Sequence, residues 1–491
     1  MNVAPTEQCS DELSGAKVRL LDSRATALVA FAVVGALLLW SRFARLDQSL
    51  WHDEIVTAEN VRDGIGEVLL GAYIPNNHRL FSVLTWATTS VVGSSGELLL
   101  RLWSVVPFVA GVFVVSAWLY KRFGALTALL YAVLVTLSPL LLDLSRQARG
   151  YGLAFLAMSV LVVAALELRR ERGGWAIPAF VGAGVAGTWT LPIFAVAFLA
   201  TAAVLLADQV LRRRLFVPLV VSALAIVAWY APNVADLGAN AKQEFGAPIA
   251  PLGIAIAPID QVVLPSLVIE GAPTPGVTTG WLVVIASVVF LLVVSPLLRD
   301  RRMCAVLVAG PVATLLVIWA TRVYLLPRFV SYLLVPLFIL LASGAAYVLS
   351  RPTTWRSAPA KVLAVTLPLA FAFQFVSVAP DVIQLPREAN RDAARLIERE
   401  SGPESVVLAY LYNPIDLDVY LGQPLRALER SEVVAAVCGA DTQVVYVTRP
   451  IFVERIDVPC LTRPGTQHER LEQFAVGGYI DVWFVPSART D

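Results

Sequence analysis

The sequence predicts a mainly α-helical membrane protein with many spans and a small α/β domain at its carboxy-terminal end. Three observations lead to this prediction. Of the 491 residues, 57% are hydrophobic and 15% are charged, and the mean hydropathy is +0.71. Apolar stretches of roughly 17–25 residues, the length of a membrane-crossing helix, recur along most of the chain. The tail after about residue 379 instead combines short β-rich runs with a charged helical pattern.

Clusters of Arg and Lys between the apolar stretches orient the predicted spans, because short cytoplasmic loops carry an excess of these residues. Placing every cluster in the cytoplasm makes residues 1–24 a cytoplasmic tail and gives about eleven spans within 25–378. The apolar segment 79–93 is short, and we expect it to lie along the outer surface as a helix, although twelve or thirteen spans remain an alternative. The expected spans are 25–41, 98–119, 124–142, 151–168, 175–189, 191–208, 215–231, 278–298, 303–321, 328–349 and 361–378.

This topology places two loops (42–97 and 232–277), two turns (143–150 and 322–327) and the tail from 379 on the outer side. In the tail 379–491, NRDAARLIERES and HERLEQFAVGG have the pattern of helices, the second ending at Gly. The runs SVVLAYL, TQVVYVT and YIDVWFVP are typical of strands. A disulfide between Cys438 and Cys460 is chemically permitted in an extracytoplasmic domain, but their spacing alone does not establish one.

The segment SLWHDEIVTAEN, residues 49–60, contains adjacent acids just beyond the first span. Acidic residues contribute little to membrane orientation, so Asp53 and Glu54 have no topological purpose there. Neighbouring residues of a helix point in different directions, so one acid can face a cavity while donors bind the other. The alternative is structural, because Asp is a good N-cap for the helix that follows.

Three further outer segments, SPLLLDLSRQARGYGL, PNNHRLFS and TRVYLLPRFVSYL, are rich in cationic and aromatic residues. Arginine on the outer side opposes the usual charge bias, and a guanidinium can bind a phosphate with two hydrogen bonds. A salt bridge to Asp143 or contact with lipid headgroups explains each arginine equally well. Together the segments predict a site for an anionic headgroup, while the net charge of +1 indicates no nucleic-acid partner. Their polar residues are Asp143, Arg146, Arg149, Tyr151, His78, Arg79, Arg322, Tyr324 and Arg328.

The order of these motifs resembles the polytopic GT-C glycosyltransferases of the protein O-mannosyltransferase and aminoarabinose–lipid A transferase type. The resemblance rests on the first span, WHDE, NNHRLFSVLTWATTSVVGSSGELLLRLWSVVPFVAGV, SPLLLDLSRQARGYGLAFLAMSVL and LPRFVSYLLVPLFILLASG, and covers about residues 20–380. The tail is similar to the small extracytoplasmic domain of many bacterial relatives. The sequence lacks the large luminal insertion of the eukaryotic enzymes and the lysine that some relatives carry in the first outer loop.

The resemblance implies an inverting transferase of the bacterial plasma membrane, with its active site facing the exterior. The donor would be a polyprenyl-phosphate sugar, and the acceptor an envelope glycolipid, polysaccharide or protein. It implies no cofactor beyond the donor and no metal for this subgroup, although the acidic pair could in principle bind a divalent cation. A flippase for lipid-linked sugars is the alternative, although the sequence shows no internal repeat of the kind that transporters carry. The implied roles are general base for Asp53 with Glu54 as its neighbour, phosphate binding for Arg146, Arg149, Arg328, His78 and Arg79, and acceptor contact or orientation for Asp143, Tyr151 and Tyr324.

Overall fold

The computed structural model falls into two compact units, each of which is described by itself. Unit 1 comprises Met1–Ala44, Asp63–Gly93 and Arg101–Ala379, and unit 2 comprises Arg45–Arg62, Ser94–Leu100 and Pro380–Asp491. The residues described are 24–71, 78–170, 174–236, 279–321, 327–351, 357–386, 389–401, 405–410, 417, 420–421, 426–429, 431–448, 458–462, 464–472 and 479–486.

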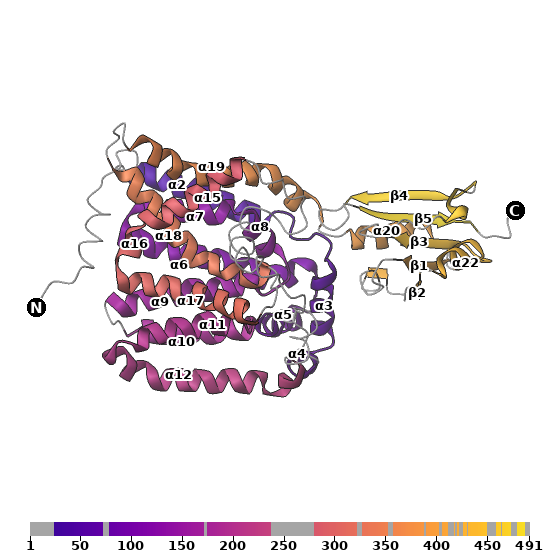
Figure 1. Ribbon diagram of the computed structural model, residues 1–491. Coiled ribbons are helices and arrows are strands. Elements are labelled where there is room, and N and C mark those ends of the chain that lie inside the picture. The colour runs from indigo at the N-terminus through magenta and orange to yellow at the C-terminus, as the bar shows by residue number, and fades with distance from the viewer. Residues whose placement is uncertain are drawn as a thin grey trace, which may run out of the picture. The chain divides into compact units, whose positions relative to one another are not determined.

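Unit 1 is a bundle of apolar helices, many of which run side by side (Figure 1). Each of the eleven predicted spans coincides with one helix or with two consecutive helices, so the predicted fold class is confirmed. In the described part of the chain, seven helices are long and apolar enough to cross a membrane, or eight if a bent pair counts as one span. The helices that coincide with the predicted spans include α2 (Arg24–Phe43), α6 (Glu97–Phe123), α7 (Ala125–Leu137), α8 (Pro139–Arg146), α9 (Tyr151–Arg170), α10 (Ala176–Thr190), α11 (Phe194–Leu206), α12 (Gln209–Tyr230), α15 (Thr279–Val294), α17 (Arg301–Thr321), η4 (Pro327–Leu333), α18 (Leu334–Ser350) and α19 (Ala358–Gln384).

Unit 1 also contains three short helices, which are α4 (Ile65–Leu70), η2 (Ala231–Asn233) and α16 (Pro296–Arg299). The segment 79–93, which we expected to lie along the surface, is the helix α5 (Arg79–Val92). It ends at Gly93, whose φ of 72° is the left-handed conformation that glycine adopts without strain. α5 packs against α4 and α10 through a face that includes Phe81 and Thr85. Most of the predicted loop 232–277 lies outside the described residues.

The segment predicted as one span over 124–142 and a turn over 143–150 contains two helices with a sharp bend between them. α7 stops at Leu137, and α8 begins at Pro139 after a bend of 66°. Proline has no N–H for the preceding helix and disfavours the helical conformation of the residue before it, so the break falls at Ser138. The Ser138 hydroxyl accepts a hydrogen bond from the backbone N–H of Leu141 and thereby caps α8. The first half of the predicted turn, residues 143–146, is therefore buried helix, and residues 147–150 form the turn.

Two glycines allow α6 and α9 to pack closely. A side chain at Gly152 would overlap the backbone carbonyl of Ser104, and one at Gly111 would lie 3.2 Å from the Leu156 Cα. Small residues at a helix interface let backbones approach, which increases van der Waals contact where no hydrophobic force joins helices in lipid. The contact fixes the first turn of α9, which carries Tyr151 and is separated from Arg149 only by Gly150.

Unit 2 contains a five-stranded mixed sheet in the order β2-β1-β3-β5-β4. β1 is parallel to β2 and β3, whereas β5 is antiparallel to β3 and β4. The three predicted strands are confirmed as β1, β3 and β5. The predicted helix HERLEQFAVGG is wrong, because its first residues form the edge strand β4, in which His468 is paired with Trp483 and Arg470 with Asp481. The strands are β1 (Val406–Tyr410), β2 (Arg426–Ala427), β3 (Val444–Thr448), β4 (Gln467–Glu472) and β5 (Tyr479–Val485).

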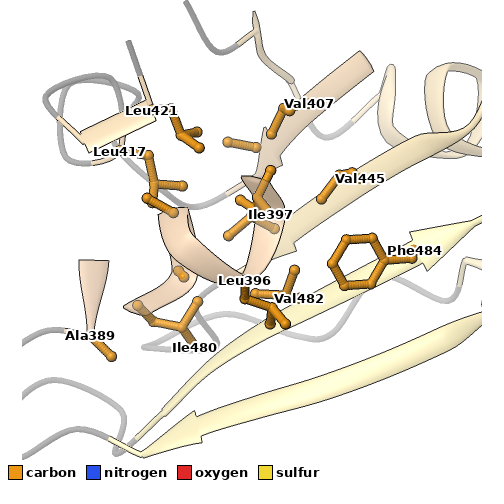
Figure 2. Packing of buried hydrophobic residues seen from close by; sticks show 14 residues of the cluster. Ala389, Leu396, Ile397, Val407, Leu417, Leu421, Val445, Ile480, Val482 and Phe484 are labelled. Carbon is orange, nitrogen blue, oxygen red and sulfur yellow. The ribbon is translucent and has the colours of Figure 1, made fainter. Parts of the chain in front are cut away.

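Each face of the sheet carries its own hydrophobic core. The predicted helix NRDAARLIERES is α20 (Asn390–Glu400), and its Leu396 and Ile397 pack against the side chains of β1, β3 and β5 (Figure 2). The opposite face is covered by α22 (Val433–Cys438) and η5 (Pro459–Thr462). Cys438 and Cys460 form a disulfide across this second core, with their Cα atoms 5.4 Å apart, which answers the question that their spacing left open.

Candidate functional site

The acidic pair lies in unit 2, in the first turn of α3 (His52–Arg62). Asp53 is 6% exposed and Glu54 is 1% exposed. The Glu54 carboxylate accepts a hydrogen bond of 3.2 Å from the backbone N–H of Trp51, just before the helix. Its own N–H and that of Ile55 donate back to the Trp51 carbonyl. Glu54 therefore has the structural role of stabilising the start of the helix, a role that the sequence offered to Asp53.

The basic residues lie in unit 1, where Arg149, His78 and Tyr151 form one buried cluster. Arg149 is fully buried, and its Nη2 lies 3.0 Å from the Nε2 of His78. A guanidinium only donates, so Nε2 accepts and the His78 proton is on Nδ1. The Tyr151 ring meets the His78 ring edge-on with centroids 4.9 Å apart, and the Arg149 guanidinium lies 5.9 Å from the Tyr151 ring centroid.

Gly150 makes this cluster possible, since it stands between Arg149 and Tyr151. A Cβ at this position would lie 3.0 Å from the Cβ and Nδ1 atoms of His78 and would overlap the Thr190 side chain. The motif ARGYG therefore includes a glycine that the packing of His78 requires.

His78 is neutral in this cluster. Its pKa is well below the usual 6.5, first because it is buried and then because Arg149 and Arg328 are close and positively charged. Its Nδ1 is buried and has no hydrogen-bond partner in the described part of the chain. His78 therefore offers an N–H donor beside a permanent cation, and not the second positive charge that the sequence suggested.

Acidification is expected to destabilise the protein through His78. The unfolded chain binds a proton at this residue near the usual pKa of 6.5, whereas the folded protein does not, so its contribution to stability is present above pH 6.5 and is lost as the pH falls below it. The limiting slope is about 1.4 kcal/mol per pH unit. Thermal unfolding of the wild type and His78→Gln in detergent, over about pH 7.5 to 5, measures this slope. The variant should lose less stability on acidification, and equal slopes would contradict the prediction.

Arg146, at the end of α8, binds backbone carbonyls of α2. Its Nη1 donates to the Ser41 carbonyl at 2.8 Å and to the Arg42 carbonyl at 3.4 Å. Asp143 lies one turn earlier on the same buried helix. The helix α8, absent from the sequence prediction, thus places Asp143 and Arg146 three residues apart on neighbouring turns, and joins α2 to the segment that carries Arg149.

Arg42 is a buried cation that sequence reasoning assigned no role. It is fully buried and donates to the carbonyls of Val135 and Thr136, at 3.3 and 3.0 Å. These are among the last carbonyls of α7, which the break at Ser138 leaves without partners inside the helix. The guanidinium also lies 5.3 Å from the Phe108 ring centroid. The signal for Arg42 was the same as for Arg146, an arginine at the predicted outer end of a span.

Two further predicted residues, Arg79 and Arg328, belong to other elements of unit 1, and Arg328 lies close to His78. Arg79 is buried at the start of α5 and donates to the Gly71 carbonyl at 3.3 Å, which also accepts from the Asn233 side chain. Arg328 lies in η4, with its guanidinium 5.5 Å from the Phe329 ring centroid. Tyr324 and Arg322 lie outside the described residues.

The described residues show no group of three or more His, Cys, Asp or Glu side chains that could hold a metal ion. The polar groups that could act on a substrate are thus the Asp53 carboxylate in unit 2 and the guanidinium and imidazole groups in unit 1. Chemically, a carboxylate can take a proton from a hydroxyl group. Buried guanidinium and N–H donors can bind and stabilise a phosphate.

Comparison with known proteins identifies the fold. No protein-family model and no curated protein matches the sequence. Among solved structures, ArnT from Cupriavidus metallidurans in the apo state is similar, with a TM-score of 0.57 and 14% sequence identity over 94% of this chain and 98% of that chain. ArnT bound to undecaprenyl phosphate gives a TM-score of 0.56 and 14% identity, covering 93% and 97% of the two chains.

The archaeal oligosaccharyltransferase AglB from Archaeoglobus fulgidus, in complex with an inhibitory peptide and a dolichol-phosphate, is similar as well. It gives a TM-score of 0.50 and 11% identity over 86% of this chain and 69% of that chain. The ArnT structures match nearly the full length of both chains, so the likeness includes both the helical bundle and the carboxy-terminal domain. The chain therefore has the fold of the GT-C membrane glycosyltransferases, as the order of its motifs indicated.

Proposed function

We propose that this protein is an inverting glycosyltransferase that transfers a monosaccharide from a polyprenyl-phosphate donor to a cell-envelope acceptor. The observation that carries the proposal is the buried cluster of Arg149, His78 and Tyr151 in a chain with this fold. The structures of ArnT bound to undecaprenyl phosphate and of AglB with a dolichol-phosphate support a lipid phosphate as the ligand.

The cationic cluster would bind the phosphate of the donor. When the bond between the anomeric carbon and the phosphate oxygen breaks, negative charge grows on the leaving phosphate, and fixed donors in a dry site stabilise that charge. Arg149 supplies a permanent cation, and the Nδ1–H of His78 supplies a neutral donor. We assign the same role to Arg146, with Arg328 and Arg79 as further phosphate contacts.

Asp53 would act as the general base. The acceptor hydroxyl is a poor nucleophile at neutral pH, and a carboxylate that takes its proton as the new bond forms lowers the barrier. The hydroxyl oxygen attacks the anomeric carbon opposite the phosphate, so the configuration inverts, the proton passes to Asp53 and the phosphate leaves with the electron pair. Glu54 fixes the start of α3, while Asp143, Tyr151 and Tyr324 are proposed to orient the acceptor.

The proposed location is the bacterial plasma membrane, with residues 1–24 in the cytoplasm, the spans within 25–378, and the domain 379–491 outside. Arginine greatly outnumbers lysine in the sequence, which is typical of GC-rich bacterial genomes. In an actinobacterial source, mannose or arabinofuranose on decaprenyl phosphate would be the first donors to test, with a lipoglycan, cell-wall polysaccharide or glycoprotein as the acceptor.

The test is to supply purified protein with radiolabelled polyprenyl-phosphate mannose, arabinose, glucose and aminoarabinose, together with envelope acceptors. We expect incorporation of label from one donor, with inverted configuration at the anomeric carbon, and only a small residual incorporation by Asp53→Asn. Movement of the lipid-linked sugar across proteoliposomes without transfer would overturn the proposal in favour of a flippase.

A further inference from the structure

We propose that the carboxy-terminal domain positions the general base, through Asn390 and Tyr420, which bind the chain just before α3. This inference rests on the proposed role of Asp53 and assigns a catalytic purpose to the domain. Both residues and the segment they bind belong to unit 2, which includes Arg45–Arg62 as well as Pro380–Asp491.

Leu50 is bound by the domain through both of its backbone polar groups. Its N–H donates to the Tyr420 hydroxyl oxygen at 2.8 Å, and its carbonyl accepts from the Asn390 Nδ2 at 3.0 Å. The two partners are 370 and 340 residues away in the sequence. A single peptide segment three residues before Asp53 is therefore held by two elements of the domain, one at the start of α20 and one near the core residues Leu417 and Leu421.

The neighbouring residues are bound in the same way. The Gln48 side chain donates to the carbonyls of Ile383 and Leu385, at 2.7 and 3.0 Å. The Ser49 hydroxyl accepts from the backbone N–H of Arg391 at 2.9 Å. Three consecutive residues, 48 to 50, thus take their hydrogen bonds from the end of α19 and from the carboxy-terminal domain.

An ion pair joins α20 to the segment Ser94–Leu100, which also belongs to unit 2. Arg391 contacts Glu97 with an N···O distance of 2.8 Å, and both side chains are only about one-fifth exposed. Arg391 therefore binds the acidic end of α6 with its side chain and Ser49 with its backbone, so one residue of the domain connects two segments that are distant in the sequence.

The hydrogen bonds of Leu50 with Asn390 and Tyr420 are called the anchor. The anchor is buried, so breaking one of its hydrogen bonds is costly. Asn390 is fully buried and Leu50 and Ser49 nearly so. Burial is the first cause that raises the pKa of Tyr420 to about 12, and the charges of Glu97 and Glu54 raise it further, against hydrogen bonds to Leu50 and Ser49 that lower it. The Tyr420 hydroxyl is therefore protonated at every physiological pH. Removing one partner would leave a buried polar group of Leu50 without its bond, which costs about 1–3 kcal/mol.

Leu50 is linked to Asp53 by a short stretch of chain and by hydrogen bonds in the first turn of α3. Trp51 follows Leu50, its carbonyl accepts the first hydrogen bonds of α3, and its N–H is bound by Glu54. The Thr57 hydroxyl then donates to the Asp53 carbonyl at 3.1 Å. A shift of Leu50 must move the first turn of α3, and a misplacement of about 1 Å of a catalytic group can cost roughly 10²-fold in rate.

The test compares Tyr420→Phe and Asn390→Ala with the wild type in the full-length protein. We expect kcat to fall about 10–100-fold while KM for the donor changes less than about twofold, because the base moves and the phosphate site does not. Hydrogen exchange of the backbone amides between residues 48 and 55 should become faster. In an Asp53→Asn background neither variant should reduce the residual rate further, as expected when a residue acts through Asp53.

Ser405→Ala is the matched control, since it removes a hydrogen bond of 2.8 Å to Gln443 within the same domain but away from this segment. It should leave kcat and the exchange rates unchanged. If hydrogen exchange of the backbone amides between residues 48 and 55 is unchanged in Tyr420→Phe, the anchor is overturned. If exchange is faster but kcat is normal, or if only the KM for the donor changes, the positioning role of the domain is overturned. A wild type that is inactive with every donor would instead overturn the proposed function, whatever the exchange experiment shows.

Discussion

Replacing Asp53 by Asn is expected to reduce transfer from the lipid-phosphate donor to a small residual rate while the protein stays folded. Asparagine has nearly the same shape as aspartate, but it cannot accept a proton at neutral pH. A positioned general base contributes roughly 10²–10⁴-fold to a rate, so a loss of this size is expected in kcat. Single-turnover transfer with a saturating donor measures the effect, and thermal unfolding in detergent verifies the fold.

Glu54→Gln is the matched control for this prediction. The glutamine side chain retains an oxygen that can accept the hydrogen bond from the Trp51 N–H, the contact through which Glu54 stabilises the start of α3. We therefore expect kcat within a few-fold of the wild type, because the hydrogen bond is kept and only the charge of its acceptor is lost. Full activity in Asp53→Asn, or an equal loss in both variants, would remove Asp53 from the role of base.

Replacing Arg149 by Ala is expected to weaken use of the donor. Hydrogen bonds to a charged group contribute about 1.5–3 kcal/mol, which corresponds to about a 10- to 150-fold loss of kcat/KM for the donor. The loss should appear mainly in KM, because the guanidinium binds the phosphate both before and during transfer. Initial rates over a series of donor concentrations, at a fixed acceptor concentration, separate the two constants.

Arg149→Lys and Arg212→Ala complete this experiment. Lysine keeps the charge but cannot make the paired hydrogen bonds of a guanidinium, so we expect an intermediate loss. Arg212 is an exposed cation on α12, and its removal should leave the donor KM unchanged. Unaltered donor kinetics in Arg149→Ala would show that the phosphate binds elsewhere.

The helical bundle was predictable because membrane spans carry two strong signals, an unbroken apolar run and flanking cations. The bend between α7 and α8 was missed although Pro139 was visible, since the apolar residues continue past it and a hydropathy pattern does not register a break. The edge strand β4 was missed for a related reason. HERLEQ has charges at helical spacing, and only its pairing with β5 makes the strand the better choice.

Residues of the candidate site were predictable where they depart from the usual charge distribution of membrane proteins. Arg146 and Arg149 were noticed because arginine is unusual on the predicted outer side, and both are buried. Arg42 also stands at the predicted outer end of a span, but it was assigned no role. The different roles of Asp53 and Glu54 depend on one contact of Glu54 with the Trp51 backbone. The anchoring of Leu50 depends on residues more than 300 positions away in the sequence. No pattern within a single sequence reports contacts of that range.

The edge strand β4 has a consequence for how the domain behaves among other molecules. A strand at the border of a sheet offers a row of backbone N–H and carbonyl groups to any extended chain that passes, which is how aggregates begin. In β4, the side chains of Gln467, His468, Glu469 and Arg470 are polar or charged and exposed. An approaching strand would have to strip water from these groups, so self-association along this border is disfavoured. A domain with an edge strand of this kind can remain dispersed among unfolded polypeptides.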